Sequence, residues 1–573
     1  MITGLVCENY RSLKRIEIPL GPLTAMVGPN GSGKTTILKS IGIVLGQAWP
    51  TLRSFHIPGD FTAYDSDKDL VLRVEFGPPL TFEDTLGKTH EIAALQVRCA
   101  AYKRRTKRAE AGDMHVDFSP LDAGGDVPMV AVGWESTRRP MFRPLTVSSG
   151  LREQALALFI DHRRSVVQHL PAVRGSALGR LLEPARREFG RANGGAAPRV
   201  EFERRYEAAM ETLRTPRVKH IEQTISETTK RSLGFLGSRA MRSIDVSFGI
   251  ADPANPFNDL RIMYREGGLL LPAEELGLGV QSAIVVGVFE ALRQLGGPIG
   301  SVVIEEPEMY LHPQAQRYFY RLLAELAERG DAQVIYSTHS PIFADATRFE
   351  SIRLVRREPG ESTSVSFVSS PEDQEYLNGR RKGLKLLTSF DPTRGEMLFA
   401  RRVLLVEGPG DQVAARYVAT EIGLDLDAED LAVVACGAKS AIPFFARTCA
   451  ALGIPFLVMH DEDVRPETGD EERVKKIRDE NRKAEAENRE ILAAALDVER
   501  VFVLRPSLEE ELGISRNASD KPRRIIGELR GRDVSAMPGD LVSAVQALGT
   551  DPSSAGDAPA PSNGSEASQD RKK

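Results

Sequence analysis

The sequence predicts an α/β protein with two parallel-sheet domains, the first of which contains a block of helical sequence. Three observations predict this class: short apolar runs alternating with helical sequence, a glycine-rich loop between an apolar run and a helix, and a second series of apolar runs after about residue 395. Runs that are apolar throughout are typical of strands buried on both faces of a parallel sheet. The 573 residues, 41% hydrophobic and 27% charged, suffice for several domains of ordinary size.

Charge and cysteine content narrow the classes of function. The net charge is −5, from 75 Lys and Arg against 80 Asp and Glu, so a nucleic-acid ligand would have to be held by local basic surface. The four cysteines, none in a CxxC pair, argue against a zinc knuckle or a disulfide framework. No stretch of 18 apolar residues and no signal-peptide pattern occurs, so we expect a cytoplasmic protein without a membrane partner.

Changes in composition and hydrophobic periodicity divide the chain into five segments. Residues 1–147 and 238–375 have the alternating pattern of one α/β domain. Residues 148–237, rich in Arg and Glu at helical spacing, indicate a helical insertion, although they could equally be that domain's own helical lobe. A second α/β domain is expected over 395–546, and the Ser-, Ala- and Pro-rich residues 547–573 are expected to be a disordered tail.

The first element with a chemical signature is GPNGSGKT, residues 28–35, which matches GxxxxGK[ST]. It lies between the apolar run Leu23–Val27 and the helical sequence TTILKSIGIVL, the strand–loop–helix context that a phosphate loop requires. Its glycines allow main-chain N–H groups to surround phosphate oxygens at a helix N-terminus. Lys34 would reach the β- and γ-phosphates of a nucleotide and Thr35 would coordinate Mg²⁺. The expected contacts are Asn30, Gly31, Gly33, Lys34, Thr35 and Thr36.

Three later segments would complete the nucleotide site. Two carboxylates follow the apolar run of SVVIEEPE, of which Glu305 would hold Mg²⁺ and Glu306 would orient or deprotonate the attacking water. His339 follows the run VIYST, where it would contact the γ-phosphate, although a histidine there is more often structural. Gly279, in LGLGVQS, opens an apolar helix whose N-terminus suits phosphate, although this could be an ordinary helix start.

In the second α/β domain, polar residues follow three successive apolar runs. Glu407 and Asp411 follow RRVLLV, the segment GAKS follows LAVVAC, and Asp461 and Asp463 follow IPFLVM. Because the carboxyl ends of parallel strands meet at one edge of a sheet, we expect these groups to converge. Asp461 and Asp463 are two residues apart, so on an extended backbone they would point to the same side.

Converging carboxylates predict a divalent-cation site, since they would otherwise repel one another. Ligation by oxygen alone favours Mg²⁺ or Mn²⁺, and four or five carboxylates suit two metal ions roughly 4 Å apart that cleave a phosphodiester. Glu509, after the run VFVL, is a fifth candidate, with Glu510 nearly as plausible. Lys521 would stabilise charge on the phosphate, although it could be a surface lysine. The expected metal ligands are Glu407, Asp411, Asp461, Asp463 and Glu509, and the expected catalytic groups are Glu306, Lys521, Asp461 and Asp463.

The segments ENYRSLKRIEIPLGPLTAMVGPNGSGKTT, LGLGVQS, IEEPEMYLHPQ and STHSP, in that order, resemble ABC-type ATPases of the RecF and SMC kind. The resemblance implies that ATP is bound between two ATPase heads, with the signature loop of one head completing the site of the other, and hence a homodimer. Two features depart from the pattern: Glu305 stands where Asp is usual, and LGLGVQ matches the LSGGQ signature loosely. Both departures bear on the rate of ATP hydrolysis more than on the binding of ATP.

The EG…DxD order after residue 400 resembles a Toprim domain, and its combination with the ATPase segments resembles the OLD (overcoming lysogenisation defect) family of nucleases. That resemblance implies an ABC-type ATPase domain with a helical dimerisation insertion, followed by a Toprim domain with a Rossmann-like parallel sheet. It also implies a DNA substrate cleaved with two metal ions, in phage defence or DNA repair, and allows a helicase or other defence partner. The alternatives are a RecF- or SMC-like DNA-binding ATPase scaffold with an inactive Toprim domain, and a toxin-like nuclease that cuts RNA.

Overall fold

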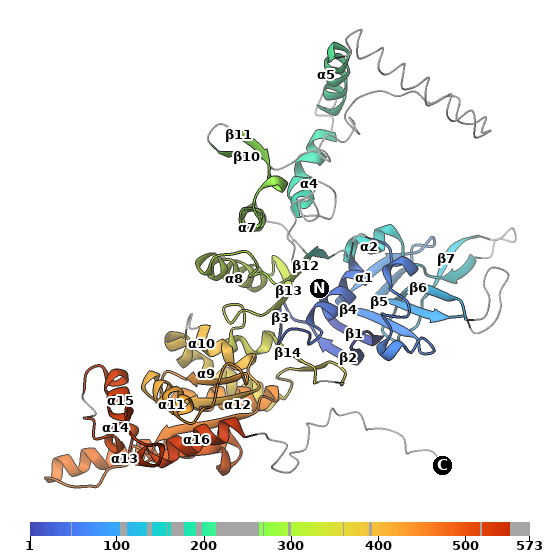
Figure 1. Cartoon of the computed structure of the whole chain (residues 1–573). Helices are drawn as coiled ribbons and strands as arrows, with labels where there is room; N and C mark the ends of the chain where they lie inside the picture. The colour runs from blue at the N-terminus through green and yellow to red at the C-terminus, as the bar shows by residue number, and fades with distance from the viewer. Residues whose placement is uncertain are drawn as a thin grey trace, which may run out of the picture. The chain divides into compact units, whose positions relative to one another are not determined.

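The structure is a computed structural model of the chain (Figure 1). It describes residues 1–46, 48–102, 112–134, 140–155, 157–161, 177–190, 198–213, 263–266, 269–295, 300–358, 360–388, 392–515 and 518–550. Contacts divide the chain into two compact units. Residues 1–26, 30–338 and 355–365 belong to the first, and residues 27–29, 339–354 and those from 366 onward belong to the second. Within the described ranges, the helices are all too short or too polar to cross a membrane.

The first unit contains an antiparallel sheet of five strands in the order β2-β1-β4-β5-β6. Buried and half-buried residues alternate along the first half of β4, as expected for a sheet with one face in the core. A separate hairpin, β7 with β8, and the short helix α2 follow the sheet along the chain. The bounds are β1 Ile2–Tyr10, β2 Leu13–Pro19, β4 Leu70–Glu83, β5 Thr89–Ala101, β6 Met114–Leu121, β7 Met129–Trp134, β8 Pro140–Pro144 and α2 Ser149–Ala155.

A second sheet has six strands in the order β15-β14-β3-β13-β12-β9. Strand β12 pairs in parallel with both β9 and β13. The expected strands Leu23–Val27, Val302–Ile304 and the run before His339 are all present in it. The bounds are β3 Leu23–Val27, β9 Leu158–Ile160, β12 Gly300–Glu305, β13 Ala332–Thr338, β14 Ile352–Arg356 and β15 Ser364–Ser366.

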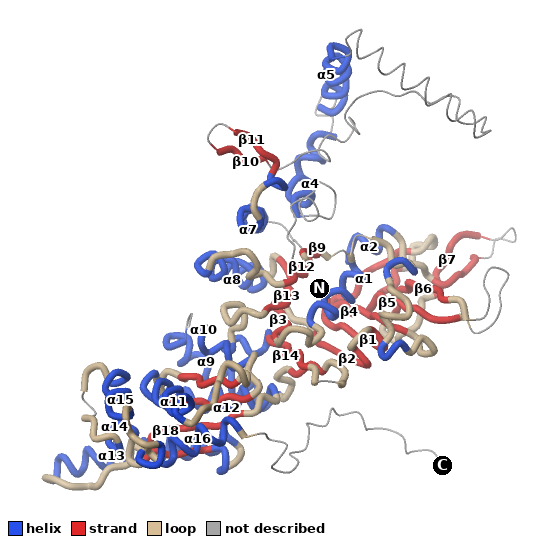
Figure 2. The backbone as a smooth tube through the Cα atoms, viewed as in Figure 1, coloured by secondary structure: helices blue, strands red, loops and turns tan. Residues whose placement is uncertain are grey.

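Helix α1, Lys34–Leu45, lies between these two sheets (Figure 2). It packs against β1, β4 and β5 of the antiparallel sheet and against β12 and β13 of the parallel one. Contact on two opposite sides explains why its sequence is apolar nearly all round, and five of its six large aliphatic residues between Ile37 and Leu45 are fully buried. Burial on both sides fixes the helix start that follows the phosphate loop.

The remaining helices of the first unit include α7 and α8, which contact each other, and α4, which contacts both α5 and α7. The apolar run Ala283–Val288, whose sequence alone resembles a strand, lies inside α7 and is helical. A strand assignment there is wrong, whereas the helix start expected in LGLGVQS is present. A small hairpin, β10 with β11, precedes α7. The bounds are α4 Ala177–Gly190, α5 Pro198–Leu213, β10 Met263–Glu266, β11 Leu269–Pro272, α7 Leu278–Leu295 and α8 Pro313–Glu328.

Strand β9 corrects the expected start of the helical insertion at residue 148. It lies within the range 148–237, yet its main chain pairs with β12 at the edge of the parallel sheet, from Leu158↔Val302 to Ile160↔Ile304. A three-residue edge strand carries too little pattern to be recognised in sequence. Helices α4 and α5 agree with the helical periodicity read there, whereas residues 162–176 and 214–237 lie outside the described residues.

The second unit is built on a four-stranded parallel sheet in the order β17-β16-β18-β19. The four apolar runs expected as strands after residue 395 are these strands. Residues such as Leu404 and Val406 pack with α11, α15 and α16 on one face, and α12 contacts β16 and β18 on the other (Figure 2). Burial on both faces explains the continuous apolar runs. The bounds are β16 Arg402–Val406, β17 Leu431–Ala435, β18 Phe456–Asp461 and β19 Val501–Leu504.

Helices α11, α12 and α13 connect the successive strands of this parallel sheet. Two helices of the unit, α13 and α16, differ in detail from the sequence-based expectation. The charged segment read as a solvated helix is α13, but it buries a stripe that includes Asn481, Ala484 and Ile491. Helix α16 runs to Gly549 with Leu548 fully buried, so the ordered chain extends past the expected end at residue 546; residues 551–573 lie outside the described residues. The bounds are α9 Pro371–Thr388, α10 Pro392–Gly395, α11 Pro409–Glu421, α12 Ile442–Leu452, α13 Glu471–Ala495, α14 Leu508–Glu511, α15 Lys521–Leu529 and α16 Gly539–Gly549.

Candidate functional site

Three carboxylates gather at the C-terminal edge of the parallel sheet in the second unit. Glu407 directly follows β16, Asp461 is the last residue of the adjacent strand β18, and Asp463 lies two residues further on. Parallel pairing of β16 with β18, in the register Val406↔Met459, brings these strand ends together. One oxygen from each of the three carboxylates lies within 4.8 Å of the others. The expected convergence of acidic groups from separate segments is present.

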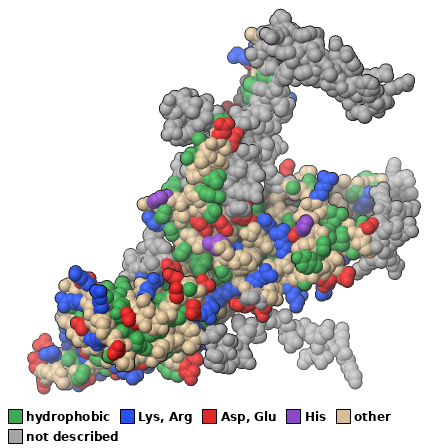
Figure 3. Space-filling model, viewed as in Figure 1, with side chains coloured by type: hydrophobic (Ala, Val, Ile, Leu, Met, Phe, Trp, Pro, Cys, Tyr) green, Lys and Arg blue, Asp and Glu red, His purple; other side chains and the backbone are tan. Residues whose placement is uncertain are grey.

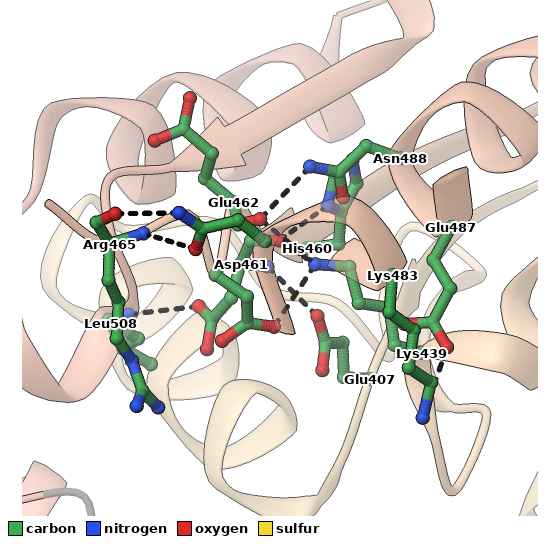
Figure 4. Close-up of polar contacts among 12 residues, drawn as sticks. Glu407, Lys439, His460, Asp461, Glu462, Arg465, Lys483, Glu487, Asn488 and Leu508 are labelled. Atoms are coloured by element: carbon green, nitrogen blue, oxygen red, sulfur yellow. Dashed lines mark hydrogen bonds and ion pairs between the residues drawn. The ribbon is translucent and has the colours of Figure 1, made fainter. Parts of the chain in front are cut away.

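Main-chain N–H groups hold the carboxylates of this cluster (Figure 4). The N–H of Asp461 donates to Oε1 of Glu407 at 3.0 Å, and the N–H of Leu508 donates to Oδ1 of Asp461 at 2.9 Å. Asp411 stands in the first turn of α11, where its Oδ2 accepts from the N–H of Gly408 at 3.0 Å. Because these donors belong to fixed strand and helix ends, the acidic side chains are oriented before any ligand binds.

Asp463 reaches the cluster by a route that the sequence did not predict. The expectation that Asp461 and Asp463 share a side rested on extended backbone, but β18 ends at Asp461 and Asp463 adopts the left-handed region, with φ of 60°. Its N–H donates to the carbonyl of Pro506 at 2.9 Å, which anchors the turn to the segment after β19. The two carboxylates lie together because of this turn and not because of strand alternation.

Burial and mutual repulsion raise the pKa values of the clustered carboxyls. Burial, reinforced by the charges of Asp411 and Glu407, raises the pKa of Asp461 to about 8. Burial and the charge of Asp411 raise the pKa of Glu407 to about 7, and burial is the main cause that raises the pKa of Asp411 to about 6. Carboxyls with raised pKa values keep their protons near neutral pH and release them when a cation binds.

Glu509 and Lys521 lie beside this cluster. Lys521 Nζ is 2.7 Å from Glu509 Oε1, and Glu509, on α14, is mostly buried. The charge of Glu509 raises the pKa of Asp411, and that of Lys521 lowers it, so both groups are near that carboxylate. Of the two glutamates that the sequence left open, Glu509 thus contacts Lys521 and raises the pKa of Asp411.

The donor set fits a divalent cation that prefers oxygen. Glu407, Asp411, Asp461, Asp463 and Glu509 offer carboxylate oxygens only. The raised pKa values of Glu407, Asp411 and Asp461 reflect burial and the negative charges gathered there. Mg²⁺ and Mn²⁺ bind such groups, whereas zinc favours histidine and cysteine. His460, next to Asp461, is buried, which lowers its pKa to about 4, and its Nδ1 lies 2.8 Å from the carbonyl oxygen of Asp461.

Lys439 is a residue of this site that the sequence analysis left without a role. It follows β17 within GAKS, and its Nζ donates to the carbonyl oxygens of Asp461 and Glu462 and to Oδ2 of Asp463 (Figure 4). The signal that could have found it was present: a lysine placed after the second of three successive apolar runs whose ends were expected to converge.

The loop expected to bind a nucleotide has the backbone that its glycines predict. Gly31 and Gly33 have φ of 75° and 110°, values that residues with a side chain rarely adopt. A Cβ at Gly33 would lie 2.5 Å from Oγ1 of Thr363. The Thr363 hydroxyl donates to the carbonyl oxygen of Ser32 at 2.8 Å and so supports the loop from outside the motif.

Lys34 opens helix α1 and is 4% exposed. Burial lowers its pKa to about 8, while the charges of Glu306 and Glu308 oppose that shift, so both carboxylates face the lysine. Glu308, which the sequence analysis did not single out, also accepts a 2.8 Å hydrogen bond from the Thr338 hydroxyl. Glu305 is the buried last residue of β12. The region around Lys34 therefore contains one more acidic group than expected.

The other nucleotide residues occupy the expected elements. Asn30 is exposed in the loop, and Thr35 and Thr36 are half-buried in the first turn of α1. Gly279 is the exposed second residue of α7, where a Cβ would lie 3.4 Å from the carbonyl oxygen of Tyr310. His339 directly follows β13.

On the face shown in the space-filling view, Lys and Arg side chains alternate with Asp and Glu over the second unit (Figure 3). This mixture agrees with the near-neutral composition. On this face, attraction for a polyanion would therefore depend on local groups and not on a uniform positive field.

Family models match most of the first unit and part of the second. The model described as "AAA ATPase domain" matches residues 1–109 and 148–344, and the model described as "Overcoming lysogenization defect protein-like, TOPRIM domain" matches residues 398–463. The second match spans Glu407, Asp411, Asp461 and Asp463. The first match includes residues 148–160, in agreement with the place of β9 in the parallel sheet.

Comparison with known proteins finds a relative that matches nearly the whole chain. The chain is 52% identical to "OLD nuclease" of Thermus scotoductus over 96% of its own length and 98% of that protein. It is 27% identical to "Old nuclease" of Escherichia phage P2 over 28% of this chain and 27% of that one, and 27% identical to "Endonuclease GajA" of Bacillus cereus strain VD045 over 29% and 27%. An ATPase domain followed by an acidic TOPRIM sheet, with this coverage and identity, shows that the chain belongs to the OLD nuclease family.

Proposed function

We propose that the chain is an ATP-binding, divalent-metal-dependent DNA endonuclease whose cleavage site is the carboxylate cluster of the second unit. The observation that carries the proposal is the convergence of Glu407, Asp461 and Asp463 within 4.8 Å, at the edge where parallel sheets build their sites. The similarity to a nuclease over nearly the whole chain supports the same reaction class.

In this proposal Glu407, Asp411, Asp461, Asp463 and Glu509 hold one or two Mg²⁺ or Mn²⁺ ions. Bound metal ions supply Lewis acidity toward the phosphodiester and lower the pKa of metal-bound water. Main-chain donors to Glu407, Asp411 and Asp461 keep the ligands oriented, and Lys521, 2.7 Å from Glu509, supplies positive charge for the scissile phosphate.

The first unit would bind ATP. Lys34 would pair with the β- and γ-phosphates, Thr35 would orient toward Mg²⁺ together with Glu305, and Glu306 would position the attacking water. The burial of Lys34 between carboxylates supports this assignment, because an anionic phosphate there would remove the cost of burying its charge. His339 and Gly279 would contact the γ-phosphate within one head and across two heads, respectively.

We further propose a homodimer formed when ATP is bound. Around Gly279 the surface exposes large apolar side chains, with Leu278 at 42%, Val280 at 39% and Tyr310 at 42%. Exposed apolar groups beside a phosphate-binding helix start are what a second ATPase head would cover. Helices α4 and α5, within the expected dimerisation insertion, remain a second candidate surface.

Cleavage of supercoiled and linear DNA tests the proposal directly. The purified chain is incubated with Mg²⁺, Mn²⁺ or Ca²⁺, each with and without ATP, beside an RNA of equal length. Nicking or cutting of DNA that requires Mg²⁺ or Mn²⁺ and is stopped by EDTA is expected. If DNA stays intact under every condition, the nuclease assignment is wrong and the ATPase-scaffold alternative remains. If only RNA is cleaved, the substrate is RNA and not DNA.

A further inference from the structure

Lys439 is a buried cation with three protein acceptors. Its side chain is 7% exposed. Its Nζ donates to the carbonyl oxygen of Asp461, to that of Glu462 at 3.3 Å and to Oδ2 of Asp463 at 3.1 Å. An ammonium group has three N–H bonds, so these acceptors use its full donor capacity. A lysine is rarely buried to this extent unless it is paired, which indicates a specific role for its position.

The groups that Lys439 contacts all belong to the turn that carries two of the clustered carboxylates. That turn leaves β18 at Asp461 and places Asp463 in the left-handed region, a conformation that costs free energy for a residue with a side chain. Other parts of the fold also hold it: the N–H of Glu462 donates to the carbonyl oxygen of Leu504 at 2.8 Å, and the Asn488 amide donates to that of Glu462 at 2.9 Å (Figure 4). Lys439 contacts both the main chain of this turn and the Asp463 carboxylate.

We propose that Lys439 is a positioning residue, whose ammonium group fixes the Asp461–Asp463 turn in the shape that presents both carboxylates to a divalent cation. The proposal rests on the function proposed for the cluster. In this role Lys439 acts through Asp461 and Asp463 and not on the scissile phosphate or the nucleophile. Its side chain approaches from the segment after the edge strand β17, which therefore contributes support, whereas β16 and β18 contribute ligands.

The direction in which metal affinity changes when the Lys439 ammonium is removed distinguishes a positioning role from a simple charge effect. A positive charge close to the carboxylates repels an incoming cation, so its removal would strengthen metal binding if charge were its only contribution. If Lys439 holds the turn, its removal instead weakens metal binding. Residues that orient metal ligands typically change affinity by about 10- to 100-fold when they are replaced.

The test compares Lys439→Met, which keeps a long side chain but loses the ammonium, with Lys439→Arg and with the control Lys483→Met, whose side chain is 79% exposed on α13. Mn²⁺ affinity of the full chain is measured by calorimetry and by the spin resonance of free Mn²⁺. We expect about tenfold or weaker binding for Lys439→Met, a smaller loss for Lys439→Arg and none for the control. Equal or tighter binding by Lys439→Met would overturn the proposal.

Two further readouts keep the outcome decisive. Thermal unfolding without metal shows whether Lys439→Met folds. If it does not fold, Lys439→Arg is the deciding variant, because it keeps the charge but cannot place one donor nitrogen among three acceptors. Unchanged Mn²⁺ affinity in Lys439→Arg would then refute the positioning role. DNA cleavage is measured separately on the unaltered chain. A chain that binds Mn²⁺ in a Lys439-dependent way but cleaves no DNA refutes the proposed function and retains the positioning role.

Discussion

The main-chain N–H of Asp461 donates a 3.0 Å hydrogen bond to Oε1 of Glu407, so that the end of β18 holds the side chain that follows β16. Two carboxyls that repel each other are thereby kept in contact by the sheet itself. The geometry belongs to the fold and exists before a cation binds. The cluster can therefore be tested by replacing its carboxylates or by changing their protonation with pH.

Replacing Asp461 and Asp463 by Ala together should abolish metal-dependent DNA cleavage. The change removes two of the three oxygens that lie within 4.8 Å of one another, and the remaining carboxylates are too few to hold the cation in a catalytic geometry. ATP binding should be unchanged. Plasmid nicking is compared with that of Asp479→Ala, a control whose side chain is 66% exposed. Undiminished cleavage by the double variant would refute the assignment of the cluster.

The stability of the metal-free protein should fall as pH rises from about 4 to about 8. The pKa of Asp461 is raised to about 8 and that of Glu407 to about 7, so in this interval the folded state holds protons that the unfolded state has lost. The free energy of unfolding therefore decreases with pH. Urea unfolding at several pH values measures the slope, which should be smaller in Asp461→Asn and smaller again with saturating Mg²⁺. A slope identical in all three samples would contradict the prediction.

Replacing Lys34 by Ala should weaken ATP binding by about 10- to 100-fold, the magnitude of a hydrogen bond to a charged group. The side chain is buried among carboxylates, so no other cation is expected to substitute for it. Nucleotide affinity is measured by fluorescence with a labelled ATP analogue. Lys39→Ala, on the exposed side of the same helix, serves as the control. Unaltered affinity in Lys34→Ala would remove the phosphate-loop assignment.

Replacing Lys521 by Ala should lower the rate of DNA cleavage by about 10²- to 10³-fold with little change in Mn²⁺ affinity. Its ammonium group lies at the edge of the cluster, 2.7 Å from Glu509, and is 40% exposed, so a phosphate can reach it. Single-turnover cleavage at saturating Mn²⁺ gives the rate, with the exposed Arg523→Ala as the control. A rate equal to that of the unaltered chain would make Lys521 an ordinary surface lysine.

Replacing Glu306 by Gln should stop ATP hydrolysis while ATP remains bound, so that the proposed dimer accumulates. Sedimentation velocity with and without ATP measures the dimer, and phosphate release measures hydrolysis. Adding Val280→Asp should return the protein to monomers, because a charge would then be buried at the surface proposed to meet the second head. Dimers that form equally well without ATP, or with Val280→Asp present, would contradict this interface.

The sequence alone determined the elements whose signals are local. The phosphate loop, the strand that ends at Glu305 and the four strands after residue 395 each occupy a short stretch, and each could be read from apolar runs and glycine spacing. The convergence of Glu407 with Asp461 also followed, because the rule that parallel strand ends share an edge turns strand order into proximity.

Only the tertiary structure decided the contacts that depend on packing between distant segments. The three-residue strand β9 is recognisable only by its pairing with β12, the turn that carries Asp463 is set by bonds to the segments after β17 and β19, and Lys439 gains its role from the oxygens around its Nζ. Glu308 and Thr363 likewise act through neighbours remote in sequence. A side chain's rotamer and burial depend on everything packed around it, and a linear pattern does not contain that information.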